Sequence, residues 1–405
     1  MDSSFDIRSF DVLILGAGLV GSSLACALEN RGLRVGLVEA SAAASGPSGF
    51  DERKLALSAA SLNALRELGV LAEMQPAPTP IRRIHVSRVG DFGSVLLDAT
   101  DYGRDAFGGV VLARELGQAL SAKLDQLSNL TRVCPATVVS VTPDEAGPKV
   151  EIERDGRREM LTARLLVAAD GTRSLARSAF SIGVDEHDYR QHLFVSTVQT
   201  DRSPDGTAYE RFSAQGPVAM LPMSGAIHGG LCGVASEDVE RVAALDDAAY
   251  AEYFQQRFGW RAGRIRRVGK RTHYPLIRVV AQRLTAPRLV VMGNAAQTIH
   301  PIGAQGFNLG LRDALTLADC LVNAGDPGNA DVLAEYADAR AEDRQQTLAL
   351  SDGLARITSN DSFPMRALRS FGLGLLGGVS GMRAPLVSSA MGFGGRVPRL
   401  VRGRS

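Results

Sequence analysis

Residues 10–39 read FDVLILGAGLVGSSLACALENRGLRVGLVE, and the order of residue types in this stretch decides the fold class. Residues 10–15 are an apolar run of strand formers, residues 16–21 read GAGLVG, and helical spacing of apolar residues follows up to Gly32. Residues 35–38 then predict a second strand that ends at Glu39. A strand, a glycine-rich turn, a helix and an acidic residue about 20 positions further on are typical of a dinucleotide-binding α/β unit.

Each residue of this fingerprint has a physical role. Gly16 permits a tight turn, Gly18 lets backbone N–H groups approach a pyrophosphate, and Gly21 lets the helix pack closely on the strand. The helix N-terminus favours the negative charge of the phosphates, and Glu39 is expected to accept hydrogen bonds from a ribose. A glycine turn without a ligand is the alternative, and the fingerprint alone does not distinguish NAD from FAD.

The bulk composition is that of an ordinary globular protein. The chain has 405 residues, which favours two domains or one large domain with an insertion. Hydrophobic residues make up 45% and the formal net charge is +1, so no charge bias points to a nucleic acid as partner. The four cysteines form no CxxC pair, which argues against a zinc cluster or a disulfide framework. Without an export signal or an apolar run of about 18 residues, we expect a cytoplasmic protein.

Two further segments add candidate ligand contacts. Arg53 precedes residues 55–68, whose spacing predicts a helix, so this arginine either contacts phosphates or a ribose or is solvated. Asp170 and Gly171 follow the apolar strand predicted at residues 165–169. Ligands bind at the carboxyl ends of parallel strands, which favours a site here, and an ordinary Asp-Gly turn is the alternative.

The later part of the chain predicts a second sheet and a second ligand-binding turn. Residues 76–100 and 185–280 contain short alternating stretches separated by Gly, Pro and Asp, which indicate an inserted antiparallel sheet. Residues 289–292 predict a strand, followed by a loop of small residues and a helix from about Gly306. The small residues leave backbone N–H groups bare at that helix start, where an electron-rich planar edge or a developing anion binds well.

Three motifs, in this order, resemble the FAD-dependent aromatic hydroxylases of the p-hydroxybenzoate hydroxylase type, and more closely their ubiquinone-biosynthesis branch. They are GAGLVG at 16–21, ADGTRSLAR at 169–177 and GNAAQTIHPIGAQGFNLGLRDA at 293–314. The resemblance implies an α/β fold with a Rossmann-like FAD-binding domain of the GR2 type, an inserted antiparallel-sheet substrate domain and a C-terminal helical segment. We expect the FAD-binding domain to comprise residues 1–75, 101–180 and 285–350, the substrate domain residues 76–100 and 181–284, and the C-terminal segment residues 351–405.

The same resemblance implies roles for individual residues. Pro301 lies beside the expected position of the isoalloxazine ring, and His300 either contacts flavin or substrate or fixes the turn, so these two are the candidate catalytic residues. No metal is expected. The residues expected to contact FAD are Gly16, Gly18, Gly21, Glu39, Arg53, Arg114, Asp170, Gly171, Asn294, Gly303, Gly306, Phe307 and Asn308.

The third motif departs from the usual family pattern at three places. Asn294 replaces the aspartate that binds the ribitol chain, and an amide oxygen still accepts that hydrogen bond. Gln297 replaces a common histidine. Gly303 and Ala304 stand in the reverse of the usual order, which changes the expected conformation of the loop.

The implied reaction is hydroxylation of a polyprenylated phenol in ubiquinone biosynthesis. NAD(P)H or another electron donor would reduce FAD, and O2 would then give a flavin C4a-hydroperoxide that passes one oxygen atom to the ring. One alternative is another FAD oxidoreductase, such as a prenyl reductase. A second is a non-catalytic FAD-binding subunit of a ubiquinone-biosynthesis protein complex.

The C-terminal segment has an unusual composition. Residues 353–405 contain eight arginines and one aspartate, interleaved with Phe, Leu, Met and Gly. One interpretation is an interfacial segment that lies peripherally on the cytoplasmic face of an anionic membrane, where each basic residue contributes about 1 kcal/mol. A helical cap packed on the FAD-binding domain is the alternative.

Overall fold

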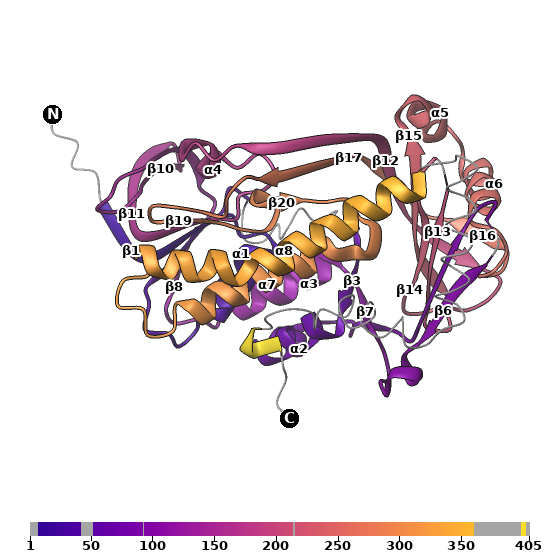
Figure 1. Ribbon diagram of the computed structural model, residues 1–405, viewed down its shortest axis with the longest axis horizontal. Coiled ribbons are helices and arrows are strands. Elements are labelled where there is room, and N and C mark those ends of the chain that lie inside the picture. The colour runs from indigo at the N-terminus through magenta and orange to yellow at the C-terminus, as the bar shows by residue number, and fades with distance from the viewer. Residues whose placement is uncertain (1–6, 42–51, 92, 214, 360–397, 402–405) are drawn as a thin grey trace.

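The computed structural model describes residues 7–41, 52–91, 93–213, 215–359 and 398–401. Its main sheet, sheet A, has eight strands (Figure 1). The central strand β1 (Ile7–Leu15) pairs in parallel with two neighbours, and the parallel set continues outward from both of them. The other strands of the sheet are β2 (Val35–Val38), β8 (Leu130–Val133), β9 (Thr137–Thr142), β10 (Lys149–Arg154), β11 (Arg157–Ala168), β18 (Thr285–Ala286) and β19 (Leu289–Val291).

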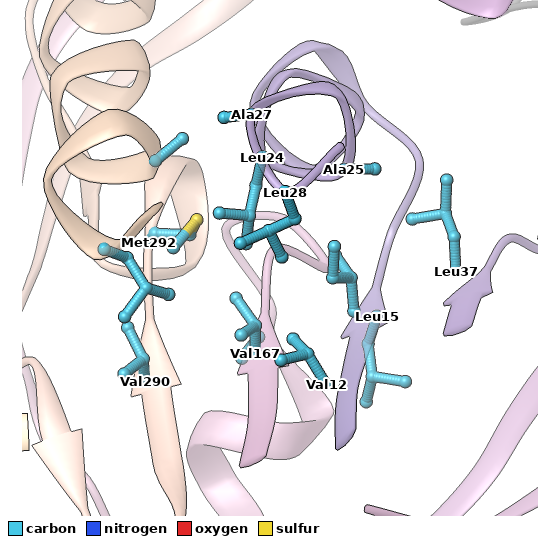
Figure 2. Packing of buried hydrophobic residues seen from close by; sticks show 14 of the residues in the cluster. Val12, Leu15, Leu24, Ala25, Ala27, Leu28, Leu37, Val167, Val290 and Met292 are labelled. Atoms are coloured by element: carbon cyan, nitrogen blue, oxygen red, sulfur yellow. The ribbon is translucent and has the colours of Figure 1, made fainter. Parts of the chain in front are cut away.

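Helices cover this sheet because its strands are apolar on both faces. Strand β2 is buried along its whole length, as expected for an interior parallel strand. Figure 2 shows Leu24 of α1 (Leu19–Ala27) and Leu28, the C-cap residue of this helix, over Val12 of β1 and Val167 of β11. All four side chains are fully buried. The helices α3 (Ala113–Leu124) and α7 (Gln305–Cys320) flank α1, and α8 (Ala330–Ser359) lies along α7.

Sheet C is a second, nine-stranded sheet, whose strands β13, β14, β15 and β6 lie at the right of Figure 1 and whose strand β20 lies near the middle. All its pairs are antiparallel except β13 with β5, which confirms the predicted antiparallel sheet. The helices α5 (Val239–Ala243) and α6 (Asp247–Phe258) pack on one face. Its strands are β5 (Arg83–Arg88), β6 (Ser94–Asp98), β12 (Val184–Thr200), β13 (Thr207–Phe212), β14 (Val218–Pro222), β15 (Ile227–Ala235), β16 (Ile265–Val268), β17 (Thr272–Ala281) and β20 (Gln297–Thr298).

A small third sheet, sheet B, corrects the expectation of a helix over residues 55–68. Residues 54–58 form strand β3 (Lys54–Ser58), which pairs antiparallel with β7 (Gly108–Leu112), and β7 also pairs with β4 (Thr79–Ile81). Helix α2 (Ala59–Glu67) begins only after Ser58, whose hydroxyl caps it by accepting from the N–H of Ser61. Long-range pairing with β7 therefore overrides the local helical spacing at Leu55.

The remaining elements are short. They are α4 (Leu175–Ala179) and the 3-10 turns η2 (Val70–Glu73), η3 (Ala99–Tyr102), η4 (Ser236–Asp238), η5 (Gly293–Ala295), η6 (Ile302–Ala304) and η7 (Arg399–Val401). Among the helices that the structure describes, none is long and apolar enough to cross a membrane. Residues 360–397, which contain most of the segment predicted to be an interfacial segment or a cap, lie outside the described residues.

Candidate cofactor and substrate site

The first glycine turn combines two closely packed glycines with one open glycine. A Cβ on Gly16 would lie 2.4 Å from the carbonyl oxygen of Ala169, and a Cβ on Gly21 would lie 2.0 Å from that of Gly16. Gly16 also has a φ of +99°. A Cβ on Gly18, in contrast, would meet nothing within 4 Å. Gly16 and Gly21 therefore allow the chain to pack, and Gly18 leaves space at the start of α1.

The N-terminus of α1 has bare backbone donors. Gly18 is the N-cap residue, no side chain caps this end, and the first turn contains no acidic residue. Glu39 follows β2, and its Oε2 accepts a hydrogen bond of 2.9 Å from the N–H of Ala17. Its Oε1 accepts one of 2.9 Å from Ser41. The turn thus joins a positive helix end to a fixed carboxylate, an arrangement that suits a phosphate with an adjoining ribose.

Arg53 and Arg114 lie near each other, although 60 positions separate them in the sequence. The N–H of Ala113, next to Arg114, donates to the carbonyl oxygen of Arg53. The Arg114 guanidinium donates to Oε1 of Glu52 at 2.6 Å and stays about one-third exposed. Arg114 therefore lies in the first turn of α3, and the backbone of Arg53 lies beside the start of that helix.

Asp170 and Gly171 follow β11, the neighbour of β1. The Oδ2 atom of Asp170 accepts from the N–H of Ala176 at 3.3 Å, at the start of α4. Its Oδ1 atom is buried and has no hydrogen-bond partner among the described residues. Arg177 donates to the carbonyl oxygen of Ala295 at 2.8 Å, so this motif is joined to the third motif. Gly171 has a φ of +87°, which favours glycine.

The third motif forms the turn before α7. Gly303 and Ala304 have φ values of +69° and +52°, and Ala304 is the N-cap of α7 without a side-chain cap. A Cβ on Gly306 would meet nothing within 4 Å. Gly303 and Ala304 stand in the reverse of the usual family order. The helix start that follows them is nevertheless open, as the small residues of the loop predicted. The helix itself begins at Gln305, one residue before the expected Gly306.

Asn308 has a different environment from its neighbours in the motif. Its Nδ2 donates to the carbonyl oxygens of Ala56 and Ala304, at 3.0 and 2.8 Å. Its Oδ1 accepts from the Ser58 N–H at 3.0 Å and from the Ser61 hydroxyl at 2.7 Å. All four bonds are to protein atoms, so this side chain ties the start of α7 to β3 and α2.

The other residues of the third motif differ in exposure. Asn294 is exposed, whereas Gly293 and Gly310 are buried against Val20 of α1, where added Cβ atoms would lie 3.1 and 2.7 Å from its side chain. Phe307 is partly buried against the core of sheet A. The three segments around the two helix starts thus pack directly on one another.

The His300 side chain is buried, and its contacts are with other protein groups. Its Nδ1 accepts from the N–H of Ile302 at 3.3 Å, and its ring makes an edge contact with Tyr189, with centroids 4.8 Å apart. Tyr189 donates to Asp352 of α8 at 3.1 Å. Burial lowers the pKa of the His300 imidazole to about 4, while the Asp352 carboxylate acts in the opposite direction. A neutral ring in these contacts suits the fixing of the turn.

Gln297 belongs to a buried charged network between α7 and α8. Its Nε2 donates to Oδ2 of Asp313 at 2.6 Å, and its Oε1 accepts from Arg344 at 2.9 Å. Asp313 also pairs with Arg340 at 2.7 Å, and both side chains are fully buried. This amide, at the position where the family commonly has histidine, therefore bridges a carboxylate and a guanidinium.

A cavity lies between sheet C and the turn before α7. Its lining is apolar except for Glu210 on β13, a residue that the sequence analysis did not single out. Burial raises the pKa of the Glu210 carboxyl to about 7, and a backbone hydrogen bond from Gly303 opposes that rise. The other lining residues are Leu193, Pro217, Ala219, Leu231, Pro301 and Ile302. The candidate catalytic Pro301 thus lies on the same cavity as the Glu210 carboxylate.

These features are typical of a class of protein, the nucleotide-binding α/β proteins: two open helix starts beside a parallel sheet, with a cavity next to the second helix start. Comparisons with known proteins agree with this class of protein. A family model described as "FAD binding domain" matches residues 9–351. The chain therefore belongs to this FAD-binding family and, within it, to the FAD-dependent hydroxylases.

Individual relatives cover almost the whole chain. Ubiquinone hydroxylase UbiL of Rhodospirillum rubrum is 36% identical over 97% of this chain and 92% of its own length. The 3-demethoxyubiquinol 3-hydroxylase of Escherichia coli is 30% identical over 90% and 93%. Among solved structures, p-nitrophenol 4-monooxygenase PnpA of Pseudomonas putida DLL-E4 superposes with a TM-score of 0.81 over 96% of this chain and 99% of its own, at 19% identity.

The residues present fit FAD. The space above Gly18 and Gly306, the uncapped helix starts behind them and the unpartnered Oδ1 of Asp170 offer room, donors and an acceptor to an extended dinucleotide. These features lie at three places, the starts of α1 and α7 and the end of β11, and an extended ligand with a phosphate end and a ring end suits them.

Proposed function

We propose that the protein hydroxylates the aromatic ring of a polyprenylated phenol in ubiquinone biosynthesis, with FAD as cofactor, O2 as co-substrate and NAD(P)H as electron donor. The observation that carries the proposal is the open start of α7 beside Pro301, next to a small apolar cavity of about 30 Å³ that must widen to admit a ring. An apolar lining with one acidic group suits a greasy phenol. Similarity to proteins named as ubiquinone hydroxylases supports the same substrate class.

In this proposal the first and second motifs bind the ADP half of FAD. The N–H groups at Gly18 and the start of α1 bind the pyrophosphate, and Glu39 binds the ribose. Arg53 and Arg114, on either side of the α3 start, add positive charge. Asp170 and Gly171 contact the middle of the cofactor, which gives the buried Oδ1 of Asp170 a partner.

The third motif binds the flavin half. Asn294, which is exposed at the turn, accepts from the ribitol chain, and the segment from Gly303 to Phe307 lies along the ring. When bound and reduced, FAD activates O2 and supplies the oxygen atom that enters the phenol. The bare N–H groups at the start of α7 stabilise negative charge on the ring, and Pro301 closes the cavity against water.

His300 and Asn308 act as positioning residues in this account. His300 accepts from Ile302 and contacts Tyr189, so it fixes the turn that carries Pro301. Asn308 binds Ala304 and Ser58 and so sets the direction of the α7 start. Neither side chain needs to touch the reacting atoms.

Deletion of the gene tests the function in the cell. The expected result is loss of ubiquinone and accumulation of a precursor that lacks one ring hydroxyl, restored by the wild-type gene. An unchanged quinone pool contradicts the proposal. With purified protein, a prenyl reductase would oxidise NAD(P)H without consuming O2, and a non-catalytic subunit would bind FAD without either reaction.

We also propose the domain division described for the sequence and peripheral membrane association through the C-terminal segment. The test of association is flotation with vesicles of phosphatidylglycerol and phosphatidylcholine, using the full chain and a chain that ends after Ser359. This end point keeps Ser351 and Asp352, which contact His300 and Tyr189. Flotation of the full chain alone supports association, and equal recovery in the soluble fraction contradicts it.

A further inference from the structure

Glu210 lies on the face of sheet C that is turned toward the third motif. Along β13, Ala208 and Phe212 pack in clusters on the Ile81 and Ile302 side, whereas Tyr209 packs against α6. Successive side chains of a strand point to opposite faces, so Glu210 shares the face of Ala208 and Phe212. Its position in the cavity lining agrees with this alternation.

The surroundings of the Glu210 carboxyl are apolar. Its partners across the neighbouring strands are Val86 of β5 and Ala219 of β14. The other lining residues of the cavity are also apolar, and no ion pair of Glu210 occurs among the described residues. Within the described part of the chain, the carboxyl accepts a hydrogen bond from the backbone N–H of Gly303, in the turn that precedes α7. A carboxyl group thus lies between the apolar sheet and the start of the helix.

Other titratable groups lie on the elements around the cavity, and on β5 Arg88 forms a buried ion pair of 3.2 Å with Asp91. His300, in the turn, is buried with a pKa lowered to about 4, so it is neutral at neutral pH and faces Tyr189. Lys54 of β3 lies with its stem against Gly229 of β15, and burial lowers its pKa. The Glu210 carboxyl itself, with its pKa raised to about 7, exchanges a proton readily near neutral pH.

We propose that Glu210 is the general base that removes the phenolic proton of the substrate before its ring is oxygenated. In this step the phenol O–H bond breaks, its electron pair stays on the phenolate oxygen, and a new O–H bond forms on a carboxylate oxygen of Glu210. The charge moves from carboxylate to phenolate, and no oxidant is needed. A phenolate ring is more electron-rich than a phenol ring and accepts an electrophilic oxygen more readily.

The inference rests on the proposed function and adds to it an orientation of the bound phenol. The phenolic oxygen lies at Glu210, and the apolar side chains of Leu193 and Leu231 on the same cavity contact the rest of the ring and the start of the prenyl chain. The ring edge next to the hydroxyl then faces Pro301 and the start of α7. Glu210 therefore contributes both proton transfer and the choice of ring edge.

The test compares the FAD-loaded wild-type protein with Glu210→Gln, Glu210→Asp and a matched control, Glu186→Gln. Glu186 is exposed on β12 of the same sheet, far along the strand from the cavity. The first readout needs no turnover: 4-nitrophenol is bound without reductant, and the absorption band of its anion is titrated from about pH 5 to about pH 9. The second is the pH profile of kcat/KM for hydroxylation of 2-prenylphenol.

In the wild type and Glu186→Gln we expect the anion band of the bound probe to appear in two steps, because the probe and the Glu210 carboxyl share a proton, and kcat/KM to rise through an apparent pKa near 7 to a plateau. In Glu210→Gln we expect the anion band to appear in a single step and kcat to fall about 100-fold with a small change in KM. Glu210→Asp should recover part of the wild-type titration of the probe and part of the wild-type rate of hydroxylation. The flavin absorption spectrum of each variant reports that the cofactor site is intact.

The possible results test the role of Glu210 as a base separately from the proposed function. Hydroxylation by Glu210→Gln at the wild-type rate, with the wild-type titration of the bound probe, overturns the role of Glu210 and leaves the proposed function. A wild type that shows the two-step titration but hydroxylates no phenol removes the proposed function and keeps the base. A wild type that binds no phenol contradicts both.

Discussion

Asp313 of α7 and Arg340 of α8 form a fully buried ion pair, with 2.7 Å between Oδ1 and Nε. Asp343 accepts from both Arg340 and Arg312, and Gln297 donates to the other oxygen of Asp313. The strand and turn that precede α7 are therefore joined to α8 by buried charges. This network holds the third motif against the long helix that also contacts His300 through Ser351.

We predict that Arg340→Met lowers the free energy of unfolding by about 4 kcal/mol, because it leaves the Asp313 carboxylate buried without its cation. Chemical denaturation of the FAD-free protein measures the change. Arg241→Met is the control, since Arg241 pairs with Asp238 at the surface, where an ion pair contributes about 0.5 kcal/mol. Equal losses in the two variants would show that the buried network does not stabilise the fold.

The two kinds of glycine in the first turn lead to opposite expectations. Gly18→Ala should weaken FAD binding at least about tenfold, because its Cβ enters the space expected for the pyrophosphate, while the FAD-free protein loses at most about 1 kcal/mol of stability. Gly21→Ala should destabilise the protein itself, since its Cβ would lie 2.0 Å from the Gly16 carbonyl oxygen. Flavin fluorescence titration and denaturation separate these effects. Full FAD affinity in Gly18→Ala would contradict the assigned binding position.

Part of this site follows from local sequence. Gly16, Gly21 and Glu39 were predictable because a strand, a tight turn and a helix impose their requirements within about 25 residues. Leu55 was predicted wrongly to be helical, because the pairing of β3 with β7 depends on residues 50 positions away. The resemblance of the three motifs to a family also indicated FAD as the cofactor, in agreement with the FAD-binding family model that matches residues 9–351.

Glu210 and Gln297 show what local patterns leave out. The segment around Glu210 reads TAYERF, in which alternating polar residues indicate an ordinary half-exposed strand. Its apolar surroundings arise only when β5, β14 and the turn at Pro301 come together. In the sequence, Gln297 is only a departure from the family pattern. Its role as a bridge between Asp313 and Arg344 becomes visible in the folded chain.

Asn308→Ala should lower the free energy of unfolding by about 3 kcal/mol, because the N–H of Ser58 and the carbonyl oxygens of Ala56 and Ala304 lose a buried partner. Asn63→Ala on α2 is the control, since Asn63 accepts a single exposed hydrogen bond from Arg66. Urea denaturation compares them. A loss below about 1 kcal/mol in Asn308→Ala would contradict its role as the link between α7 and β3.

His300 predicts a pH dependence of stability. Its pKa is about 4 in the folded protein, below the ordinary value of 6.5, so the unfolded chain binds more protons between these values. The stabilisation by neutral His300 is present above pH 6.5 and is lost as the pH falls toward 4, by about 3 kcal/mol. His300→Asn, whose Oδ1 can still accept from Ile302, should show a shallower fall in unfolding free energy over this range. An equally steep fall in His300→Asn would contradict the role of His300 in the pH dependence. The fall in unfolding free energy that remains in this variant is expected from His228, whose pKa is also about 4.

The central claim is that this FAD-binding chain transfers an oxygen atom from O2 to a phenol ring. The most direct measurement is mass spectrometry of the product formed from 2-prenylphenol by the FAD-loaded protein with NAD(P)H under ¹⁸O2. We expect one added oxygen that carries the ¹⁸O label, with no label when only the water contains ¹⁸O. A product labelled from water, or unchanged phenol with full FAD loading and active reductant, would contradict the account.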